Sequence, residues 1–185
     1  MNNLKKGFTL IELLIVIAIL AILSVAVILV LNPAQLIKQG RDATRVSDMA
    51  AINSAIAVYM SDVDSPGIGG INNAQCASPT YTCTNTTSSA PFNGGSTSCT
   101  VTNASTTING TGWVTVDLTK ISAGAPLSKL PMDPVNSTSY MYAYGCNLLT
   151  YKLGAVMEST KYASNATGDG GTSAGWYEVG NKIDL

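Results

Sequence analysis

One carboxylate stands alone in a long apolar run near the N-terminus. From Phe8 to Leu31 the chain has no basic residue and no proline, and Glu12 is the only charged residue. A carboxylate at the centre of a membrane costs roughly 2.5–3.5 kcal/mol on insertion scales, so an acid inside such a segment usually has a function. Glu12 is therefore the first residue whose type and position predict chemistry, the pairing of a buried charge.

The common catalytic systems cannot be assembled from this chain. It contains no histidine, which excludes Ser-His-Asp and Cys-His nucleophile systems and histidine-ligated zinc. The acids beyond Asp62 are scattered singly, and no spacing singles out a catalytic pair. The formal net charge is −1, and no basic block marks a surface for nucleic acid. We expect a protein that is not an enzyme and has no direct nucleic-acid partner.

Four cysteines follow the apolar run: Cys76, Cys83, Cys99 and Cys146. Their spacings contain no CxxC, which argues against a four-cysteine zinc site. Beyond a membrane, oxidation is their ordinary fate, so we expect all four in disulfides. Three pairings exist, and the low entropic cost of closing the shortest loop favours Cys76–Cys83 with Cys99–Cys146.

The apolar run is long enough to cross a membrane as a helix. Its 24 residues, Phe8 to Leu31, rise by about 1.5 Å each and reach roughly 36 Å, against about 30 Å of hydrocarbon core. Lys5 and Lys6 precede the run, so the positive-inside rule predicts a cytoplasmic N-terminus and an extracytoplasmic C-terminal part. A secretory signal peptide has a shorter apolar region that ends in a small-residue cleavage site, and this segment does not fit that pattern.

An amphipathic helix is predicted for residues 32–62. Its apolar residues fall at three- and four-residue steps, which is typical of a helix face that packs on a core. They are Leu36, Val46, Met49, Ile52 (with Ala50), Ile56, Tyr59 and Met60. The charged residues cluster towards the other face, and we expect them to face solvent: Lys38, Arg41, Asp42, Arg45 and Asp48.

The junction of the two helical segments leaves two readings open. Asn32-Pro33 either interrupts or kinks one long helix, because proline removes a backbone donor and restricts the residue before it. Alternatively, Pro33 is the first-turn proline of a new helix that Asn32 caps.

The remaining residues, 63–185, are expected to form one head. Tyr140, Tyr142 and Tyr144 alternate with other residues, which predicts a strand with two faces, and residues 149–157 and 175–179 are its expected partners. The stretch 63–112 is rich in Ser, Thr, Asn and Gly, so we expect disulfides to hold it. The predicted fold class is α+β: a long N-terminal helix packed on a small antiparallel sheet with an irregular, disulfide-stapled loop region.

The segment KKGFTLIELLIVIAILAIL closely resembles the start of type IV pilins and the related pseudopilins. The shared features are a short basic leader, a glycine, a phenylalanine, and a glutamate four residues further on. In that family, prepilin peptidase cuts after the glycine and methylates the new N-terminus. The resemblance implies cleavage between Gly7 and Phe8, N-methylation of Phe8, removal of the leader 1–7, and a transmembrane and filament-core helix over 8–31.

The resemblance also implies a role for Glu12. Cleavage would leave an amine on Phe8, about one helical turn from the Glu12 carboxylate. In the family this glutamate meets the amine of a neighbouring subunit and sets the register, and two such charges buried in a filament core would be costly unless paired. The alternative is a glutamate near the helix start that rests at the level of the lipid headgroups.

Two C-terminal stretches resemble G-type major pseudopilins more loosely. They are LPMDPVNSTSYMYAYGC and YKLGAVME, so the resemblance covers residues 1–62 well and residues 126–158 loosely. The loop SNATGDGG, around Asp169, is similar to the calcium loop of those proteins. It has one acid where calcium needs several oxygen ligands, so we expect no cofactor and favour a simple turn over a calcium site.

The resemblance implies a pilin, a structural subunit that polymerises through its N-terminal helix into a surface filament for adhesion, motility or DNA uptake. Its expected partners are copies of itself in a helical polymer, prepilin peptidase, an inner-membrane assembly platform, and the cytoplasmic membrane before assembly. After assembly we expect it at the cell surface. Two alternatives stay open: a pseudopilin of a type II secretion or competence pseudopilus, and a membrane-anchored binding module that never polymerises.

Overall fold

A computed structural model describes residues 7–85, 99 and 101–185 of the chain. Lys5, Lys6 and part of the Ser/Thr-rich stretch therefore lie outside the described residues. The chain divides into two units, Met1–Ile37 and Lys38–Leu185. We describe each unit by itself and call Lys38–Leu185 the head unit.

The first unit contains helix α1, Leu10–Leu31, and the start of helix α2, Pro33–Asp62. Between them Asn32 adopts a left-handed conformation, with φ 42°, and ends α1. The Gln35 backbone N–H donates to the Asn32 carbonyl oxygen at 2.9 Å and to its side-chain Oδ1 at 3.4 Å. Pro33 at the first helical position has no N–H to leave unpaired. Of the two readings of this junction, the structure has the new helix that begins at Pro33.

The head unit is built on a five-stranded sheet with strand order β2-β1-β3-β4-β5. Strands β1 and β2 are parallel, and the other neighbours are antiparallel. The strands are β1 Cys76–Cys83, β2 Val101–Thr102, β3 Tyr142–Leu148, β4 Thr150–Ala155 and β5 Tyr177–Gly180. The short helical elements are η1 Ile71–Asn73, η2 Leu118–Lys120 and α3 Ala163–Gly168.

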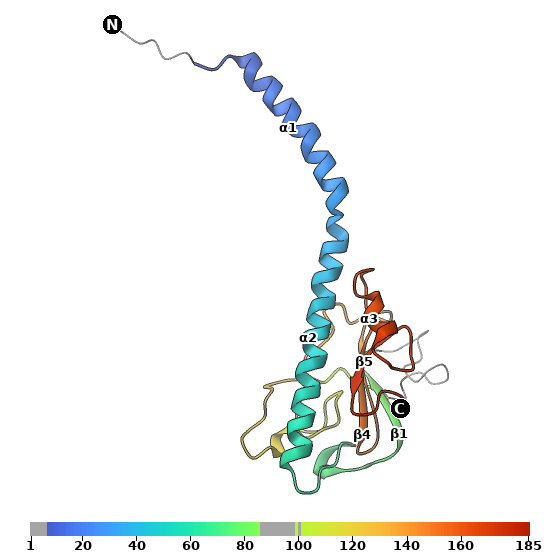
Figure 1. Cartoon of the computed structure of the whole chain (residues 1–185). Helices are drawn as coiled ribbons and strands as arrows, with labels where there is room; N and C mark the ends of the chain where they lie inside the picture. Colours follow the sequence, from blue (N-terminus) through green and yellow to red (C-terminus); the bar gives the residue numbers. More distant parts are fainter. Residues whose placement is uncertain (1–6, 86–98, 100) are drawn as a thin grey trace. The chain divides into compact units, whose positions relative to one another are not determined.

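The main core lies between α2 and one face of the sheet (Figure 1). Four of the side chains that periodicity assigned to the packing face of α2 are fully buried there: Met49, Ile52, Ile56 and Tyr59. Val46 and Met60 are partly buried, and Leu36 is 51% exposed, so its assignment to that face was wrong. They meet aromatic and aliphatic side chains of the sheet and of the long connection before β3: Trp113, Leu130, Tyr142, Tyr144, Tyr151 and Leu153. A helix stripe of this period buried on a sheet accounts for the α+β fold.

The opposite face of the sheet carries a second, smaller core. Met141 and Ala143 pack there with Tyr81 and Trp176, while Tyr142 belongs to the core beneath α2. Successive residues of β3 thus point to opposite faces, as the side-chain period of two requires. The predicted α+β fold class, a long helix with a mostly antiparallel sheet, is confirmed.

Strand β1 was not predicted, because it lies in the stretch expected to be irregular. Its sequence, CASPTYTC, contains a proline, which cannot donate to a sheet ladder and is a poor sign of a central strand. The structure accommodates Pro79 at an irregularity, where the pairing of β1 with β3 shifts register between Cys76 and Thr80.

The disulfides join Cys76 to Cys146 and Cys83 to Cys99, with Cα–Cα distances of 6.0 and 5.7 Å. The expected pairing of Cys76 with Cys83 was wrong, and the reason is β1. These two cysteines are the first and last residues of one strand, so at about 3.3 Å per residue their Cα atoms lie roughly 23 Å apart. A disulfide needs Cα atoms within about 7 Å.

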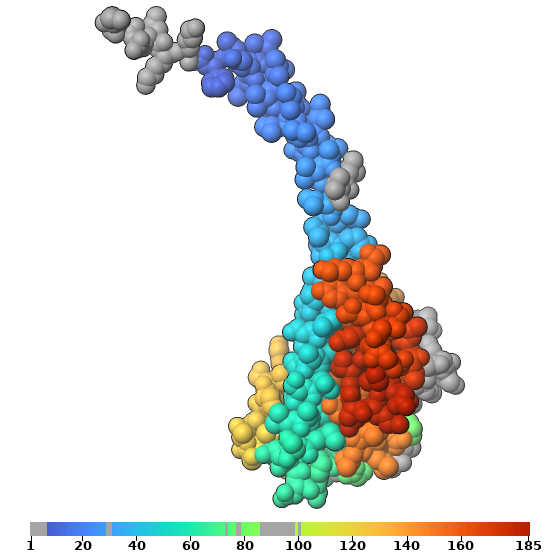
Figure 2. Space-filling view, in the orientation of Figure 1, coloured from blue at the N-terminus to red at the C-terminus, as the bar shows by residue number. Residues whose placement is uncertain are grey.

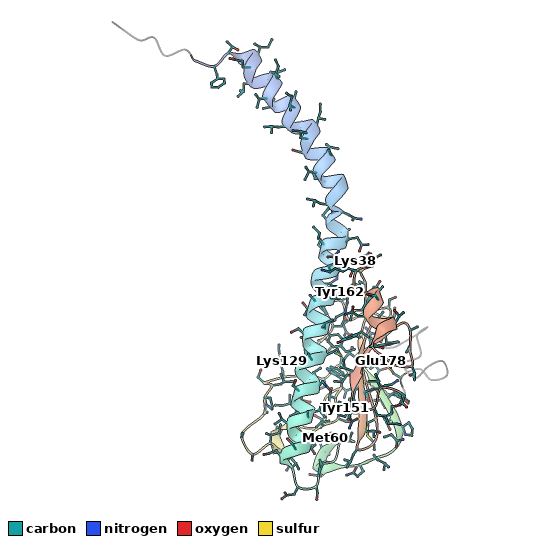
Figure 3. The ribbon with its side chains drawn as sticks, viewed as in Figure 1. Lys38, Met60, Lys129, Tyr151, Tyr162 and Glu178 are labelled. Atoms are coloured by element: carbon teal, nitrogen blue, oxygen red, sulfur yellow. A yellow bond between two sulfur atoms is a disulfide. The ribbon has the colours of Figure 1, made fainter. Side chains whose placement is uncertain are left out.

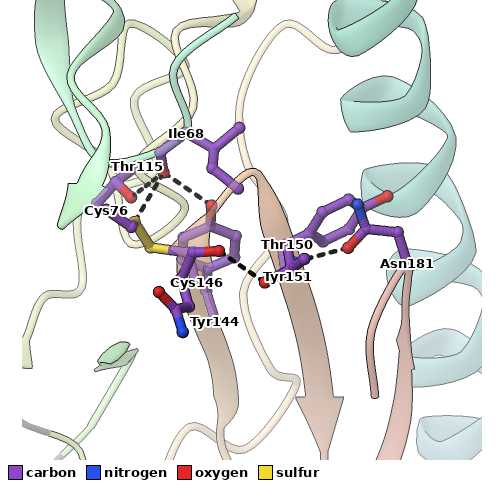
Figure 4. Close-up of a disulfide and its surroundings, with 9 residues drawn as sticks. Ile68, Cys76, Thr115, Tyr144, Cys146, Thr150, Tyr151 and Asn181 are labelled. Atoms are coloured by element: carbon purple, nitrogen blue, oxygen red, sulfur yellow. Dashed lines mark hydrogen bonds between the residues drawn. A yellow bond between two sulfur atoms is a disulfide. The ribbon is translucent and has the colours of Figure 1, made fainter. Parts of the chain in front are cut away.

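The Cys76–Cys146 disulfide sits in the main core beside the Ile68 carbonyl (Figure 4). That carbonyl oxygen accepts hydrogen bonds from the hydroxyl groups of Thr115 and Tyr144, both at 2.8 Å. The disulfide therefore links β1 to β3 next to Ile68, where hydrogen bonds also hold the connection that follows α2.

Candidate processing and assembly site

The predicted processing site lies immediately before helix α1. Gly7 and Phe8 have no regular secondary structure, and 88% of the Phe8 surface is exposed. Thr9 is the N-cap residue, and its hydroxyl oxygen accepts from the Glu12 backbone N–H at 3.3 Å. The described peptide bond between Gly7 and Phe8 is therefore outside the helix and accessible.

Glu12 completes a capping box with Thr9. Its Oε2 accepts from the Thr9 backbone N–H at 2.9 Å and from the Thr9 hydroxyl at 2.8 Å. The reciprocal bonds satisfy backbone donors that the first turn of a helix would leave unpaired. Oε1 of Glu12 accepts no hydrogen bond from the described residues. One carboxylate oxygen thus caps the helix, and the other has no partner among the described residues.

Helix α1 has no polar face. All of its side chains that the structure describes are exposed within this chain, and nearly all are Ile, Leu, Val or Ala. Its one hydroxyl, that of Ser24, donates to the Leu20 carbonyl at 2.7 Å. Among the described residues one helix, Leu10–Ile28, is long and apolar enough to cross a membrane. A helix that is apolar all round needs apolar surroundings on every side.

The outer face of α2 in the head unit carries no charge before Asp62, the last residue of the helix. We call this face the small-residue face; its members recur at seven-residue intervals, and all are exposed: Gly40, Ala43, Thr44, Ser47, Ala50, Ala51, Ser54, Ala57, Val58 and Ser61. In Figure 2 the α2 atoms, cyan to green, form part of the surface of the head unit along its length. Side chains this small allow the backbone of another helix to approach closely.

The charged residues of α2 do not all face solvent, so that expectation was wrong. Asp42 and Arg45 have no exposed surface. Arg45 donates to both oxygens of Asp133, at 2.6 and 2.9 Å, to Asp42 at 2.8 Å, and contacts Glu158 at 2.7 Å. Four ion-paired side chains from three separate segments, Asp42 and Arg45 of α2 with Asp133 and Glu158, thus meet; we call them the Arg45 cluster.

The Arg45 cluster fastens two loops to the helix. Asp42 accepts the backbone N–H groups of Glu158 and Ser159, at 2.9 and 2.7 Å, and the Ser159 hydroxyl at 2.6 Å. Asp133 accepts the backbone N–H groups of Val135 and Asn136, at 2.8 and 3.0 Å. Each buried carboxylate is therefore paired, as buried charges must be.

The electrostatics of the cluster favour the charged forms. Burial alone would lower the pKa of Arg45, but hydrogen bonds and charges from Asp133, Glu158 and Asp42 raise it above its ordinary value. The hydrogen bond from Arg41, aided by Arg45, holds the pKa of Glu158 below its usual range in spite of burial. A guanidinium with no exposed surface has no room for a substrate, so the cluster is structural.

Sequence reasoning missed this cluster because its members are single charges in separate segments. Asp133 lies in LPMDP and Glu158 ends YKLGAVME, so the two stretches that resemble major pseudopilins each contribute one carboxylate. That coincidence was the one available signal.

The segment SNATGDGG was expected to be a simple turn, but its first five residues belong to helix α3, Ala163–Gly168. The Asp169 carboxylate holds the residues that follow this helix. Asp169 accepts the Gly171 backbone N–H at 2.8 Å and the Glu178 backbone N–H at 2.6 Å. Over the described part of the chain, no group of three or more His, Cys, Asp or Glu residues could hold a metal ion. The absence of a cofactor stays a prediction.

Residues 2–28 match the Prokaryotic N-terminal methylation motif. This match confirms the resemblance to type IV pilins and pseudopilins over the segment that carries Gly7, Phe8 and Glu12. No curated protein and no solved structure matches the chain. The N-terminal segment thus has the methylation motif found in the precursors of pilins and pseudopilins.

Proposed function

We propose that this protein is a structural subunit that polymerises through its N-terminal helix into a type IV pilus-like filament at the cell surface. In this proposal, prepilin peptidase removes residues 1–7 and methylates Phe8. Residues 8–31 anchor the chain in the cytoplasmic membrane and then form the filament core. Residues 32–62 continue as the amphipathic helix, and residues 63–185 form the extracytoplasmic head.

One observation carries the proposal: the methylation motif, residues 2–28, contains most of an apolar helix whose described side chains are all exposed within this chain. A membrane provides apolar surroundings for such a helix before assembly, and the same helices of other copies provide them in the filament. The small-residue face of α2 supports the second step, because it would let neighbouring helices pack closely. The open Oε1 of Glu12 supports pairing with the amine that cleavage leaves on Phe8.

The second candidate is a pseudopilin of a secretion or competence pseudopilus. Its support is the LPMDP loop, whose Asp133 holds Arg45 in the way just described. Both candidates require a processed, polymerising subunit driven by an assembly platform, and neither requires catalysis. They differ in whether the polymer extends beyond the cell surface.

Processing is the first prediction of the proposal. Native subunit should begin at Phe8 and carry one added methyl group on its amine, because Gly7 and Phe8 are accessible and match the motif. Mass spectrometry of the N-terminal peptide measures both features. Intact Met1, or a cut near the end of α1, would contradict the proposal.

Electron microscopy of material sheared from cells then distinguishes the two candidates. Long filaments that contain the Phe8-initiated subunit support a pilus. Processed subunit that stays with the cells and forms no sheared filament supports the pseudopilus. Subunit that is unprocessed and monomeric in the membrane would leave the non-polymerising anchored module.

A further inference from the structure

The head unit carries three cations near the N-terminal end of its part of α2; one is exposed, and Lys38 and Arg41 are partly buried. Lys38 and Arg41 lie on the first described turns of α2 in this unit, and Lys161 lies just before α3. Arg41 is 31% exposed although it pairs with Glu158, and Lys161 is exposed. We call these three residues the basic end of the head.

Hydrogen bonds bring Lys161 to this end of α2. Ser159 is bound to Asp42 through its backbone N–H and its hydroxyl, and its carbonyl oxygen accepts from the Ala163 backbone N–H at 3.1 Å. Lys161 lies inside this turn. Lys38 precedes Asp42 by four residues on the helix, so the two share a side of α2. Figure 3 shows Lys38 and Tyr162 at this end of the head unit.

The carboxylates near the basic end offset its charge only in part at the surface. Asp42 and Asp133 are buried and bound to Arg45, and 4% of the Glu158 side chain is exposed. Asp48 is partly buried and accepts the Tyr142 hydroxyl at 2.6 Å. The described charges that reach solvent here are therefore three cations, Lys38, Arg41 and Lys161, and one partly buried carboxylate, Asp48.

The other end of α2 has the opposite character. Asp62 and Asp64 are exposed there, and Asp62 is linked through Ser122 to the segment that carries Lys120. From Lys38 to Asp62 the helix rises about 36 Å. Exposed carboxylates thus lie far from the basic end, which gives the head unit a direction relative to an anionic surface.

Chain connectivity limits how far Lys38 can lie from the end of α1. Lys38 follows Leu31 by seven residues, and even a fully extended chain of that length spans at most about 25 Å. The polar layer of a bilayer is about 5–7 Å thick on each side, and a lysine side chain extends its ammonium towards such a layer from an apolar stem. If α1 spans the membrane, Lys38 is within reach of the headgroups.

We propose that the basic end of the head binds anionic phospholipid headgroups while the subunit waits in the membrane. The inference rests on the proposed membrane anchoring of α1 and adds a second, electrostatic contact to it. The Lys161 Nζ atom lies 5.5 Å from the centroid of the Tyr162 ring. A cation next to an aromatic ring is a combination that suits a membrane interface. Extraction from the membrane would break this contact.

The test uses the full chain in vesicles and the rate at which a membrane-impermeant acylating reagent modifies each lysine. One set of vesicles is phosphatidylcholine alone, and the other contains equal parts of phosphatidylcholine and phosphatidylglycerol. At low salt, Lys38 and Lys161 should react about fivefold more slowly in the anionic vesicles. The attraction of one lysine to an anionic surface corresponds to a binding constant about fivefold larger, and a bound lysine is shielded from the reagent. Lys120 and Lys129 are internal controls and should react equally in both.

Salt and a paired substitution sharpen the result. High salt should abolish the protection, because the contact is electrostatic. Lys161→Gln should reduce the protection of Lys38, whereas Lys129→Gln should leave it unchanged. Sedimentation with the vesicles verifies that the chain is anchored, so a failure of the anchor is distinguished from a failure of the headgroup contact.

Several results would overturn the proposal. Equal rates for Lys38 and Lys161 in the two kinds of anchored vesicle would show that the lipid charge does not matter. Protection that follows the density of protein rather than the anionic lipid would assign the basic end to a second copy of the chain. Unchanged protection of Lys38 in the Lys161→Gln chain would show that the two lysines do not form one surface.

Discussion

Arg45 is a cation with no exposed surface, and its surroundings explain how the head unit tolerates it. Three carboxylates from α2 and two loops surround the guanidinium, and backbone N–H groups satisfy two of those carboxylates in turn. Removing one partner of a buried ion pair leaves the others uncompensated, which costs more than the pair itself contributes. We therefore expect the ion pairs of the cluster to stabilise the fold cooperatively, so that losing one side chain weakens the contribution of the others.

Arg45→Met tests that fastening. We expect the free energy of unfolding to fall by about 3–5 kcal/mol, because the substitution leaves buried carboxylates without their cation. Urea unfolding of the full chain in detergent, followed by the fluorescence of the buried Trp113 and Trp176, measures the loss. Arg41→Met is the matched control. Arg41 is partly exposed, and Glu158 remains ion-paired with Arg45 when Arg41 is removed, so we expect the free energy of unfolding to fall by about 1 kcal/mol or less. Similar losses for both variants would contradict the role given to Arg45.

The same cluster makes the head unit sensitive to acid. The hydrogen bond from Arg41 lowers the pKa of Glu158, so this carboxyl stabilises the fold fully above its unfolded pKa, about 4.3. The stabilisation is lost as the pH falls through the lower folded pKa. Denaturant unfolding at a series of pH values should show stability falling below this range. Glu158→Gln should flatten part of the fall, and Asp184→Asn, at an exposed carboxylate, should not; a slope unchanged by Glu158→Gln would refute the assignment.

Residue periodicity predicts which apolar side chains are buried, but it cannot see paired charges. Met49, Ile52 and Tyr59 fall where a helix stripe must pack, so their burial follows from the sequence. Arg45 falls outside that stripe, and its burial depends on Asp133 and Glu158 arriving from distant segments. No pattern within α2 contains that information.

At the scale of the elements, β1 decides the covalent framework of the head unit. Strands β3, β4 and β5 could be predicted from their alternation and aromatic content, because they follow the side-chain period of a sheet. Strand β1 contains Pro79 in a Ser/Thr-rich stretch, and only its pairing with β3 makes it a strand. Once Cys76 and Cys83 occupy opposite ends of that strand, the shortest loop cannot close.

The two disulfides should differ in their resistance to reduction. Cys76 and Cys146 are both buried in the main core, whereas Cys99 is partly exposed. The sequence separations, 70 for Cys76–Cys146 and 16 for Cys83–Cys99, also favour the first bridge, by about 1 kcal/mol in the chain-entropy model. We expect Cys83 and Cys99 to be alkylated at low reductant, and Cys76 and Cys146 only when the head unit unfolds.

Stepwise reduction with alkylation and peptide mass spectrometry measures this order. The double variants Cys83→Ala/Cys99→Ala and Cys76→Ala/Cys146→Ala form a matched pair, and the second should lose more stability. Simultaneous alkylation of all four cysteines, or earlier release of the core bridge, would contradict the proposed order.

At the scale of the whole molecule, the chain joins two kinds of surface that serve different surroundings. Helix α1 exposes apolar side chains all round, which suits a membrane or a filament core. The head unit has its own cores, two disulfides and the Arg45 cluster, so its fold does not depend on α1 for burial. We infer that assembly can change the surroundings of α1 without changing the fold of the head unit.

The central claim is that the Glu12 charge, and not its capping bonds, is needed for assembly. Glu12→Gln separates the two, because glutamine also fits the third position of a capping box and carries no charge. Thr9→Ala is the converse control: it removes the cap, at about 1 kcal/mol of helix stability, and leaves the carboxylate.

The most direct measurement is a count of filaments on cells that express only the Glu12→Gln subunit, with membrane fractionation and N-terminal mass spectrometry of the same cells. We predict normal insertion and cleavage after Gly7 but few or no filaments, because the buried Phe8 amine loses a partner worth roughly 3–5 kcal/mol. Thr9→Ala cells should still form filaments. Abundant normal filaments from Glu12→Gln subunits would contradict the account and leave Glu12 as a helix cap that rests at the level of the headgroups.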